Sequence, residues 1–165
     1  LAGLMEDRGE ILACDAAAGR LSLVEAGAKR LGISCIATRA QDGTVYEPSL
    51  GLFDRVLCDV PCSGLGVLHR KPEIKYRDEE AFGGLPALQY KILETAANYL
   101  KRDGMLVYST CTILPEENER VVSRFLREHP AFAPAPFGED GWSSTHLPET
   151  GGGDGFFISR IRRVE

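Results

Sequence analysis

The stretch Phe53-Asp-Arg-Val-Leu-Cys-Asp59 runs directly into Val60-Pro-Cys-Ser-Gly64. Its first half is a short, largely apolar run that ends in an acid, which is typical of a buried strand in a parallel sheet. Its second half is a turn, because a proline stiffens the backbone there and Ser-Gly lets it bend away. A structural turn needs the proline and the glycine but not the thiol of Cys62. The stretch therefore predicts a strand with functional residues at its carboxyl end.

Comparable strand patterns recur along the chain and alternate with helical patterns. Predicted strands cover 10–15, 34–38, 53–59, 105–108 and 156–161, and predicted helices cover 16–31, 85–99 and 115–129. The residues between these elements form a loop over 60–84, rich in Gly, Pro and charge, and an irregular stretch over 130–155. Strands that alternate with helices indicate one α/β domain with a mainly parallel sheet.

Apolar spacing predicts the buried side of each helix. The expected inner faces are Leu21, Leu23, Val24, Ala28 and Leu31, then Leu85, Leu88, Ile92, Ala96 and Tyr99, then Val121, Val122, Phe125 and Leu126. Pro115 is expected in the first turn of the last helix, where proline is tolerated. Leu1 to Arg8 resembles the end of an amphipathic helix stopped by Gly9, so we expect the 165 residues to be a fragment of a longer protein.

Composition excludes several classes of protein. With 44% hydrophobic and 26% charged residues among 165, the chain is neither disordered nor fibrous, and no apolar run reaches the length of a membrane helix. The net charge of −5 excludes a protein held on nucleic acid by phosphate neutralisation alone. Five cysteines without repeating spacing favour reduced thiols in the cytoplasm over a secreted disulfide scaffold.

In parallel α/β sheets, ligands bind outside the carboxyl ends of the strands. Asp15, Asp42, Asp59 and Cys111 each stand at or just past a predicted strand end, so we expect them to face one crevice. Taken alone, Asp15 suits the ribose of a nucleotide and a helix cap equally well. Asp42 suits an adenine amino group, although Asp42-Gly43 is also ordinary turn chemistry, which is the stronger interpretation of that pair by itself.

The cysteines fall into two groups. Cys14, Cys35 and Cys58 lie in apolar surroundings and are expected to be small core residues. Cys62 and Cys111 lie among polar residues in predicted loops, where a core role explains them poorly. The spacings typical of zinc ligands and the Cys-x-x-Cys redox pair are both absent, so no metal site is predicted.

Two motifs resemble those of a known family. Asp59-Val-Pro-Cys-Ser-Gly64 and Tyr108-Ser-Thr-Cys-Thr112 are similar to the two cysteine motifs of Sun-type bacterial RNA cytosine-C5 methyltransferases, whose best-known members modify small-subunit ribosomal RNA. The resemblance also includes Gly66-Val-Leu-His-Arg-Lys-Pro-Glu-Ile-Lys75, the helix around Leu88-Gln89, and Asp154-Gly-Phe-Phe157. It implies a class I, Rossmann-like fold that uses S-adenosylmethionine, and an RNA substrate.

The resemblance also implies a role for each candidate residue. Cys111 matches the nucleophile that attacks C6 of cytosine, and Cys62 matches the thiol that assists release of the methylated RNA. Asp59 matches the acid that contacts the cytosine near N3 and lines the methionine part of S-adenosylmethionine. Asp15 and Asp42 match the acids for the ribose and adenine of the cofactor. The base that removes the C5 proton stays open between a water relay and Cys62.

The resemblance leaves alternatives open as well. In DNA cytosine methyltransferases the nucleophile follows the proline of the first motif, which here is Cys62. The same chemistry on transfer RNA is one alternative function, and a non-catalytic RNA-binding or ribosome-assembly module is another. The family's first strand, Gly-rich cofactor loop and N-terminal RNA-binding region have no counterpart in residues 1–165, so we expect this segment to be the C-terminal portion of a catalytic domain, weak or inactive alone.

Overall fold

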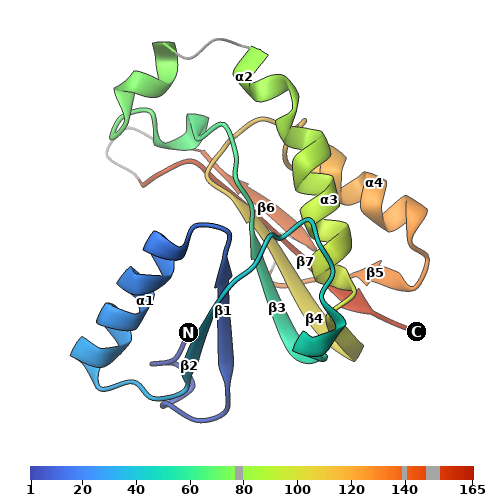
Figure 1. The fold of residues 1–165 in the computed structure, drawn as a ribbon. Coiled ribbons are helices and arrows are strands. Elements are labelled where there is room, and N and C mark those ends of the chain that lie inside the picture. Colours follow the sequence, from blue (N-terminus) through green and yellow to red (C-terminus); the bar gives the residue numbers. More distant parts are fainter. Residues whose placement is uncertain (77–79, 139–140, 148–152) are drawn as a thin grey trace. The chain divides into compact units, whose positions relative to one another are not determined.

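The computed structural model describes residues 1–76, 80–138, 141–147 and 153–165, with only the backbone of 80 and 81. The chain divides into two compact units, Leu1–Val45 and Tyr46–Glu165, and each contains its own sheet (Figure 1). Among the described residues, no helix is both long and apolar enough to span a bilayer.

The first unit is a strand–helix–strand arrangement. Strand β1 (Ile11–Asp15) pairs in parallel with β2 (Ile36–Ala40), and α1 (Ala18–Leu31) connects them. Helix α1 ends at Gly32, whose φ of 67° is the left-handed conformation that glycine adopts without a steric penalty. The predicted strand and helix over 10–31 are confirmed to within two residues, whereas the second strand lies two residues later than predicted.

The inner face predicted for α1 is only partly correct. Leu21 is buried, but Leu23 and Leu31 are 73% and 62% exposed. A sheet of two strands is narrow, and within this unit it buries only one residue of the predicted inner face of α1.

The helical interpretation of Leu1 to Arg8 is wrong. These residues form successive turns, because Glu6 and Asp7 have φ values of 52° and 56°, which an α-helix does not accommodate. The Asp7 carboxylate accepts hydrogen bonds from the backbone N–H groups of Ser34 and Cys35, both at 2.9 Å, and so fixes this segment beside the start of β2.

The second unit is built on a mixed sheet. Its elements are the 3₁₀ helices η1 (Pro48–Leu50), η2 (Leu65–Val67) and η3 (Pro72–Tyr76), the α-helices α2 (Glu80–Gly83), α3 (Leu85–Ala97) and α4 (Glu119–Glu128), and the strands β3 (Phe53–Asp59), β4 (Leu100–Thr110), β5 (Phe132–Pro134), β6 (Ser143–His146) and β7 (Phe156–Arg163). The strand order is β3-β4-β7-β5, with β6 also on β7. Strands β3 and β4 pair in parallel, as predicted, whereas β7 is antiparallel to β4, β5 and β6.

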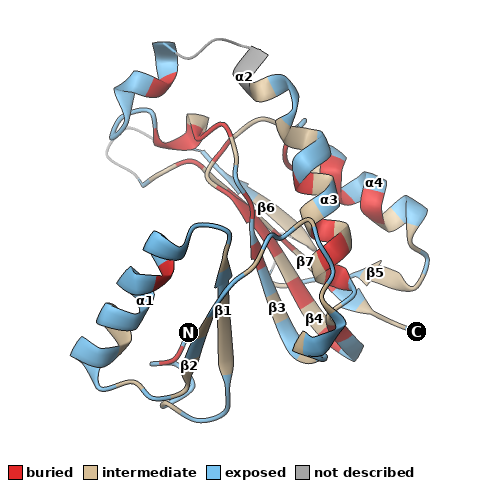
Figure 2. Ribbon diagram, in the orientation of Figure 1, coloured by how far each residue is buried: buried red, intermediate tan, exposed pale blue. Residues whose placement is uncertain are grey.

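One face of this sheet forms the hydrophobic core with α3 and α4. Leu106 and Tyr108 of β4 and Phe157 and Ile161 of β7 are fully buried, because alternate residues of a strand point to the same face. Figure 2 shows the buried residues running along these strands and along the sides of α3 and α4. The inner face predicted for α4 is confirmed, with Val121, Val122 and Phe125 buried and Leu126 partly buried.

The inner face predicted for helix α3 is only partly correct, because its members Ile92 and Ala96 are partly buried against the core while other positions are buried completely. Gln89, Leu93 and Ala97 are buried at intervals of four residues, whereas the predicted Leu88 is 39% exposed. A glutamine takes a core position here because its amide has two acceptors, the Pro61 carbonyl at 2.9 Å and Glu117 Oε2 at 2.7 Å. Apolar spacing alone does not reveal such a residue.

Three boundaries in this unit differ from the predicted ones. Strand β4 runs from Leu100 to Thr110, so it begins five residues before the predicted start at 105, and Asp103 within it has a φ of 60°. Helix α4 begins at Glu119, and Pro115 lies in the turn that precedes it. The stretch predicted to be irregular contains β5 and β6, both paired with β7.

Candidate functional site

The two cysteine motifs meet at one edge of the second sheet. Strands β3 and β4 are parallel, so their carboxyl ends lie side by side, and Asp59 is in register with Ser109. The pairing continues one residue past β3, where the Val60 N–H donates to the Ser109 carbonyl at 3.2 Å. Because both loops start from this shared edge, Cys62 and Cys111 are brought together.

The two thiols are in direct contact. Cys62 Sγ and Cys111 Sγ lie 3.2 Å apart, and both residues are partly buried. Burial, together with the hydrogen bond to Cys111, raises the pKa of the Cys62 thiol above its ordinary value. Cys62 is therefore a protonated thiol at neutral pH, able to donate its proton in a hydrogen bond to Cys111.

Asp59 stands at the same strand end. Its Oδ1 accepts a hydrogen bond from Ser109 Oγ at 2.9 Å, and among the described residues no other side chain donates to this carboxylate. The residue is exposed, so one carboxylate oxygen is held in place while the other faces solvent. The structure thus places Asp59 with the two cysteines, as the sequence predicts.

The two loops are joined by further bonds. Ser63 Oγ and Thr112 Oγ1 lie 2.8 Å apart, and the Gly66 N–H donates to the Cys111 carbonyl at 3.0 Å. The Gly155 N–H donates in turn to the Gly66 carbonyl at 2.7 Å. A Cβ at position 66 would lie 2.1 Å from the Gly155 carbonyl oxygen, so three backbone segments cross here at a distance that only glycine allows.

Sequence analysis missed three polar residues beneath this site. Gln89, Glu117 and Asn118 are buried, with exposures of 2% or less, and bond to residues of the two cysteine loops. A glutamine inside an apolar stripe was the available signal for Gln89. The sequence carries no comparable signal for Glu117 and Asn118, because Glu-Asn before a helix is ordinary surface composition.

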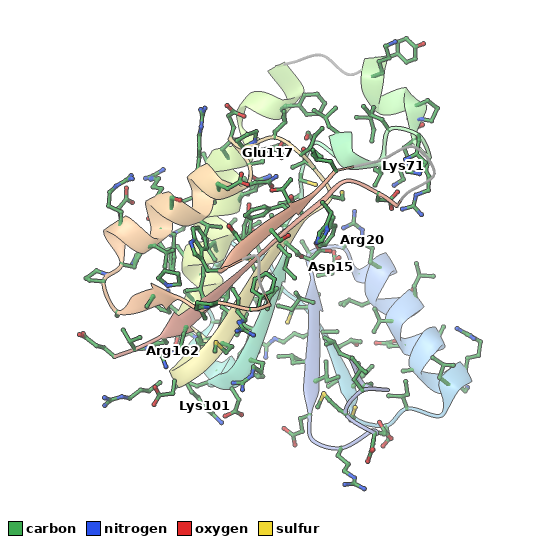
Figure 3. All side chains as sticks on the ribbon, turned by 180° about the vertical axis from the view of Figure 1, so that it is seen from behind. Asp15, Arg20, Lys71, Lys101, Glu117 and Arg162 are labelled. Carbon is green, nitrogen blue, oxygen red and sulfur yellow. The ribbon has the colours of Figure 1, made fainter. Side chains whose placement is uncertain are left out.

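Asp15 and Asp42 lie in the first unit, at the carboxyl ends of β1 and β2. Asp15 Oδ1 accepts from the Ala17 N–H at 2.7 Å, and Oδ2 lies 3.4 Å from Arg20 Nη1 (Figure 3). Asp42 Oδ1 accepts from the N–H and the hydroxyl of Thr44, and these bonds lower the pKa of the Asp42 carboxyl. Asp42 therefore has the turn role that the sequence offered for it. The helix-cap interpretation of Asp15 is wrong, because the N-cap residue of α1 is Ala17 and no described side chain caps this helix; Asp15 instead closes the turn before it. The expectation of one crevice shared with Asp59 and Cys111 stays a prediction.

The remaining cysteines divide differently from the prediction. Cys58 is a core residue, and burial raises the pKa of its thiol to about 12. Cys35 is partly buried, but Cys14 is exposed, so a core role is wrong for Cys14. Within the ranges that the structure describes, no three His, Cys, Asp or Glu side chains form a group that could hold a metal ion.

Comparisons with known proteins identify the family to which the chain is similar. The family model described as "16S rRNA methyltransferase RsmB/F" matches residues 1–162. The "Probable ribosomal RNA small subunit methyltransferase B" of Synechocystis sp. is 38% identical to this chain, and the protein of the same name from Bacillus subtilis is 37% identical; each match covers 99% of this chain and 40% of the relative.

A solved structure agrees with these matches. NSun6 from Pyrococcus horikoshii, with SFG, superposes on 99% of this chain and 44% of its own length, with a TM-score of 0.84 and 30% identity. The predicted class I methyltransferase fold is thereby confirmed. The chain spans about 40% of the length of the curated relatives that it matches.

Proposed function

Because the chain belongs to the 16S rRNA methyltransferase RsmB/F family, we propose that the protein methylates C5 of a cytosine in small-subunit ribosomal RNA through a covalent cysteine adduct. The observation that carries this proposal is the contact between two thiols, Cys62 and Cys111, at adjoining strand ends. A protein fold does not need such a pair, whereas cytosine-C5 chemistry needs a thiol to attack the ring and a second group to help release it.

The reaction explains why a thiol is required. C5 of cytosine is a poor nucleophile until a thiolate adds to C6. In that step the S–C6 bond forms, the C5–C6 double bond opens, and a proton donated at N3 leaves C5 as an enamine carbon. After C5 has taken the methyl group, a base removes the C5 proton, the double bond re-forms and the thiolate leaves. One difficult step is thus divided into easier ones.

We assign the attack to Cys111 and the assistance to Cys62. The assignment follows the resemblance of the two motifs, in which Cys111 matches the attacking thiol and Cys62 the thiol that assists release. Burial raises the pKa of Cys62, which agrees with its part as a hydrogen-bond donor. The contact of 3.2 Å lets Cys62 donate to the sulfur of Cys111 when that sulfur leaves C6. Asp59, held on one oxygen by Ser109, faces solvent with the other and suits the polar edge of the cytosine.

The methyl donor of the family is S-adenosylmethionine, which supplies an electrophilic methyl group when bound. Asp15 and Asp42 suit the ribose and adenine of this cofactor, because they stand at the carboxyl ends of neighbouring parallel strands. Asp42 uses Oδ1 for both bonds to Thr44, and so keeps Oδ2 as an acceptor. The residues present thus fit the cofactor.

The segment beside the cysteine loops suits single-stranded RNA. Lys71 and Lys75 are exposed and Tyr76 is 83% exposed, while Ile74 packs inward with 4% exposure (Figure 3 labels Lys71). Basic side chains next to an exposed aromatic ring attract phosphates and stack on unpaired bases. This local positive charge lies in a chain whose net charge is −5, so RNA binding would be confined to particular surfaces.

The experiment uses the chain extended to the length of its curated relatives, with unmodified small-subunit ribosomal RNA and isotopically labelled S-adenosylmethionine. We expect labelled 5-methylcytidine by mass spectrometry of the nucleosides. Cys111→Ala should abolish it, Cys62→Ala should accumulate an RNA–protein adduct, and Cys14→Ser, in the first unit, should change neither. Label in transfer RNA alone would refute the ribosomal substrate. If the protein binds the cofactor but labels neither RNA, the proposed activity would be refuted in favour of the non-catalytic RNA-binding or ribosome-assembly module.

A further inference from the structure

A buried carboxylate is bonded to the loop that carries Cys62. Glu117, labelled in Figure 3, belongs to the turn between the Cys111 loop and α4. Only 2% of it is exposed. No ion pair of Glu117 is found among the described residues, and its Oε1 has no hydrogen-bond partner there. A buried carboxylate without a cation is costly for stability, so its position calls for another explanation.

Glu117 holds the peptide groups on both sides of Cys62. Its Oε2 accepts from the Ser63 N–H at 2.9 Å and from Gln89 Nε2 at 2.7 Å. The same Gln89 amide donates to the Pro61 carbonyl at 2.9 Å. Because Pro61 and Ser63 are the two neighbours of Cys62 in the chain, these bonds fix the backbone that carries this thiol.

Asn118 does the same for Cys111. Its Oδ1 accepts from Thr110 Oγ1 at 2.6 Å, and its Nδ2 donates to the Thr112 carbonyl at 3.0 Å. Thr110 and Thr112 are the two neighbours of Cys111 in the chain. Asn118 is fully buried and is the N-cap residue just before α4, yet its side chain makes no capping bond to that helix, because it is committed to the loop.

The two holding residues are adjacent and are themselves anchored. Tyr108, which is fully buried in β4, donates its hydroxyl proton to the Glu117 carbonyl at 2.6 Å. Glu117 and Asn118 therefore connect the Cys62 loop and the Cys111 loop to one short rigid segment. A shift of that segment would move the two sulfurs relative to each other.

We propose that Glu117 and Asn118 form a positioning clamp that sets the separation of the Cys62 and Cys111 sulfurs. Neither residue touches the reacting atoms. Glu117 acts on the peptide groups beside Cys62, directly at the Ser63 N–H and through Gln89 at the Pro61 carbonyl. Asn118 acts on the neighbours of Cys111, through the Thr110 hydroxyl and the Thr112 carbonyl. The catalytic meaning of the clamp rests on the proposed function, in which the two thiols act in sequence on one base. The part of the proposal that concerns the sulfur–sulfur separation does not rest on the proposed function, because the two thiols are in contact whatever the substrate is.

The test compares variants of the full-length protein on two readouts. The first is the rate at which the azo oxidant diamide links Cys62 to Cys111 in a disulfide, followed by peptide mapping. The second is the division of methyl transfer between kcat and the KM for RNA. Glu117→Leu removes the acceptor, and Glu117→Gln retains one carbonyl oxygen. Glu116→Gln is the matched control, since Glu116 is exposed and, among the described residues, its one ion pair is with Arg120 at 3.0 Å.

For Glu117→Leu we expect crosslinking to slow by about tenfold or more and kcat to fall about 100-fold, since a displacement of about 1 Å costs that much in a positioned reaction. The KM for RNA should stay within about twofold of the wild type, because this buried residue makes no contact with a substrate. Glu117→Gln should recover most of both rates, and Glu116→Gln should match the wild type. Thermal unfolding confirms that each variant is folded.

A folded Glu117→Leu variant with wild-type crosslinking and kcat would overturn the clamp. If Glu117→Leu does not fold, Gln89→Met decides, because it keeps the bond from Ser63 to Glu117 and loses the amide that holds Pro61. We expect it to slow crosslinking several-fold, and an unchanged rate would overturn the proposal. If the wild type methylates no RNA, the proposed function is refuted. If the variants of that protein still lose the crosslinking, the clamp is supported independently.

Discussion

Replacing Gly66 by alanine should disrupt the crossing of three backbone segments at the candidate site. The added Cβ would lie 2.1 Å from the Gly155 oxygen, 2.6 Å from the Gly155 carbonyl carbon and 2.8 Å from the Cys111 oxygen. All three atoms belong to backbone, so no flexible side chain can move aside. The Gly155 carbonyl would have to retreat by roughly 1 Å or more to reach ordinary contact distance.

The magnitude follows from what that retreat breaks. The bonds from Gly66 N–H to Cys111 and from Gly155 N–H to Gly66 are each worth about 0.5–1.5 kcal/mol net. Losing both would cost about 1–3 kcal/mol, and keeping them would instead require overpacking of a similar cost. Because the chain takes the less costly route, the two penalties do not add. We expect the free energy of unfolding to fall by about 1–3 kcal/mol.

Urea unfolding followed by tryptophan fluorescence measures this change in the second unit. Trp142 is the single tryptophan of the chain and packs against the core. The matched control is Gly153→Ala, two residues from Gly155, where a Cβ meets nothing within 4 Å. It should stay within about 0.5 kcal/mol of the wild type. The reasoning is refuted if Gly66→Ala also stays within that range.

Two further predictions concern ionisable groups. Burial raises the pKa of Cys58 to about 12, so the folded state keeps this thiol neutral while the unfolded chain ionises it above about pH 8.5. The free energy of unfolding should therefore fall as the pH rises above that value, by at most about 1.4 kcal/mol per pH unit. Urea unfolding at pH 8 and pH 10 measures this fall, which should be smaller in Cys58→Ala than in the wild type. Equal falls in the two proteins would show that ionisation of Cys58 is not the cause. In the first unit, the N–H groups of Cys35 and Ser34 hold the pKa of Asp7 well below its usual range. The stabilisation that Asp7 provides should therefore be complete at neutral pH. It should be lost only as the pH falls below the ordinary pKa of an aspartate. Asp7→Ala should speed hydrogen exchange at the amides of Ser34 and Cys35 at pH 7 by several-fold, with no change at Val122, and unchanged exchange at all three would contradict that role.

The parts of the fold that the sequence predicts well are those in which local pattern and burial agree. The strand Phe53–Asp59 is predicted to the residue, because a short apolar run between turn residues admits few alternatives. Strands β5 and β6 are missed because they are short and Ser143–His146 is polar. They are strands only because β7 offers them an edge, and that edge depends on residues far away in the sequence.

The candidate site divides in the same way. Cys62 and Cys111 were predicted because a thiol in a polar turn is unusual, and parallel strands then bring the two together. Gln89, Glu117 and Asn118 were missed because their burial depends on partners 28 or 54 residues away, or on a loop that folds back onto the helix start. A polar side chain whose partners are distant looks, in the sequence, like a surface residue.

The central place of β7 has a consequence for the synthesis of the chain. One edge of β7 pairs with β4, and its other edge receives β5 and β6, so none of these strands completes its pairing until Phe156–Arg163 has left the ribosome. Translation proceeds at roughly 5–20 residues per second, so the nascent chain waits seconds between the emergence of Thr110 and that of Phe156. During that interval one edge of β4 offers unpaired N–H and carbonyl groups to other nascent chains. Chaperones that cover exposed strand edges would therefore be needed most by this protein just before β7 emerges.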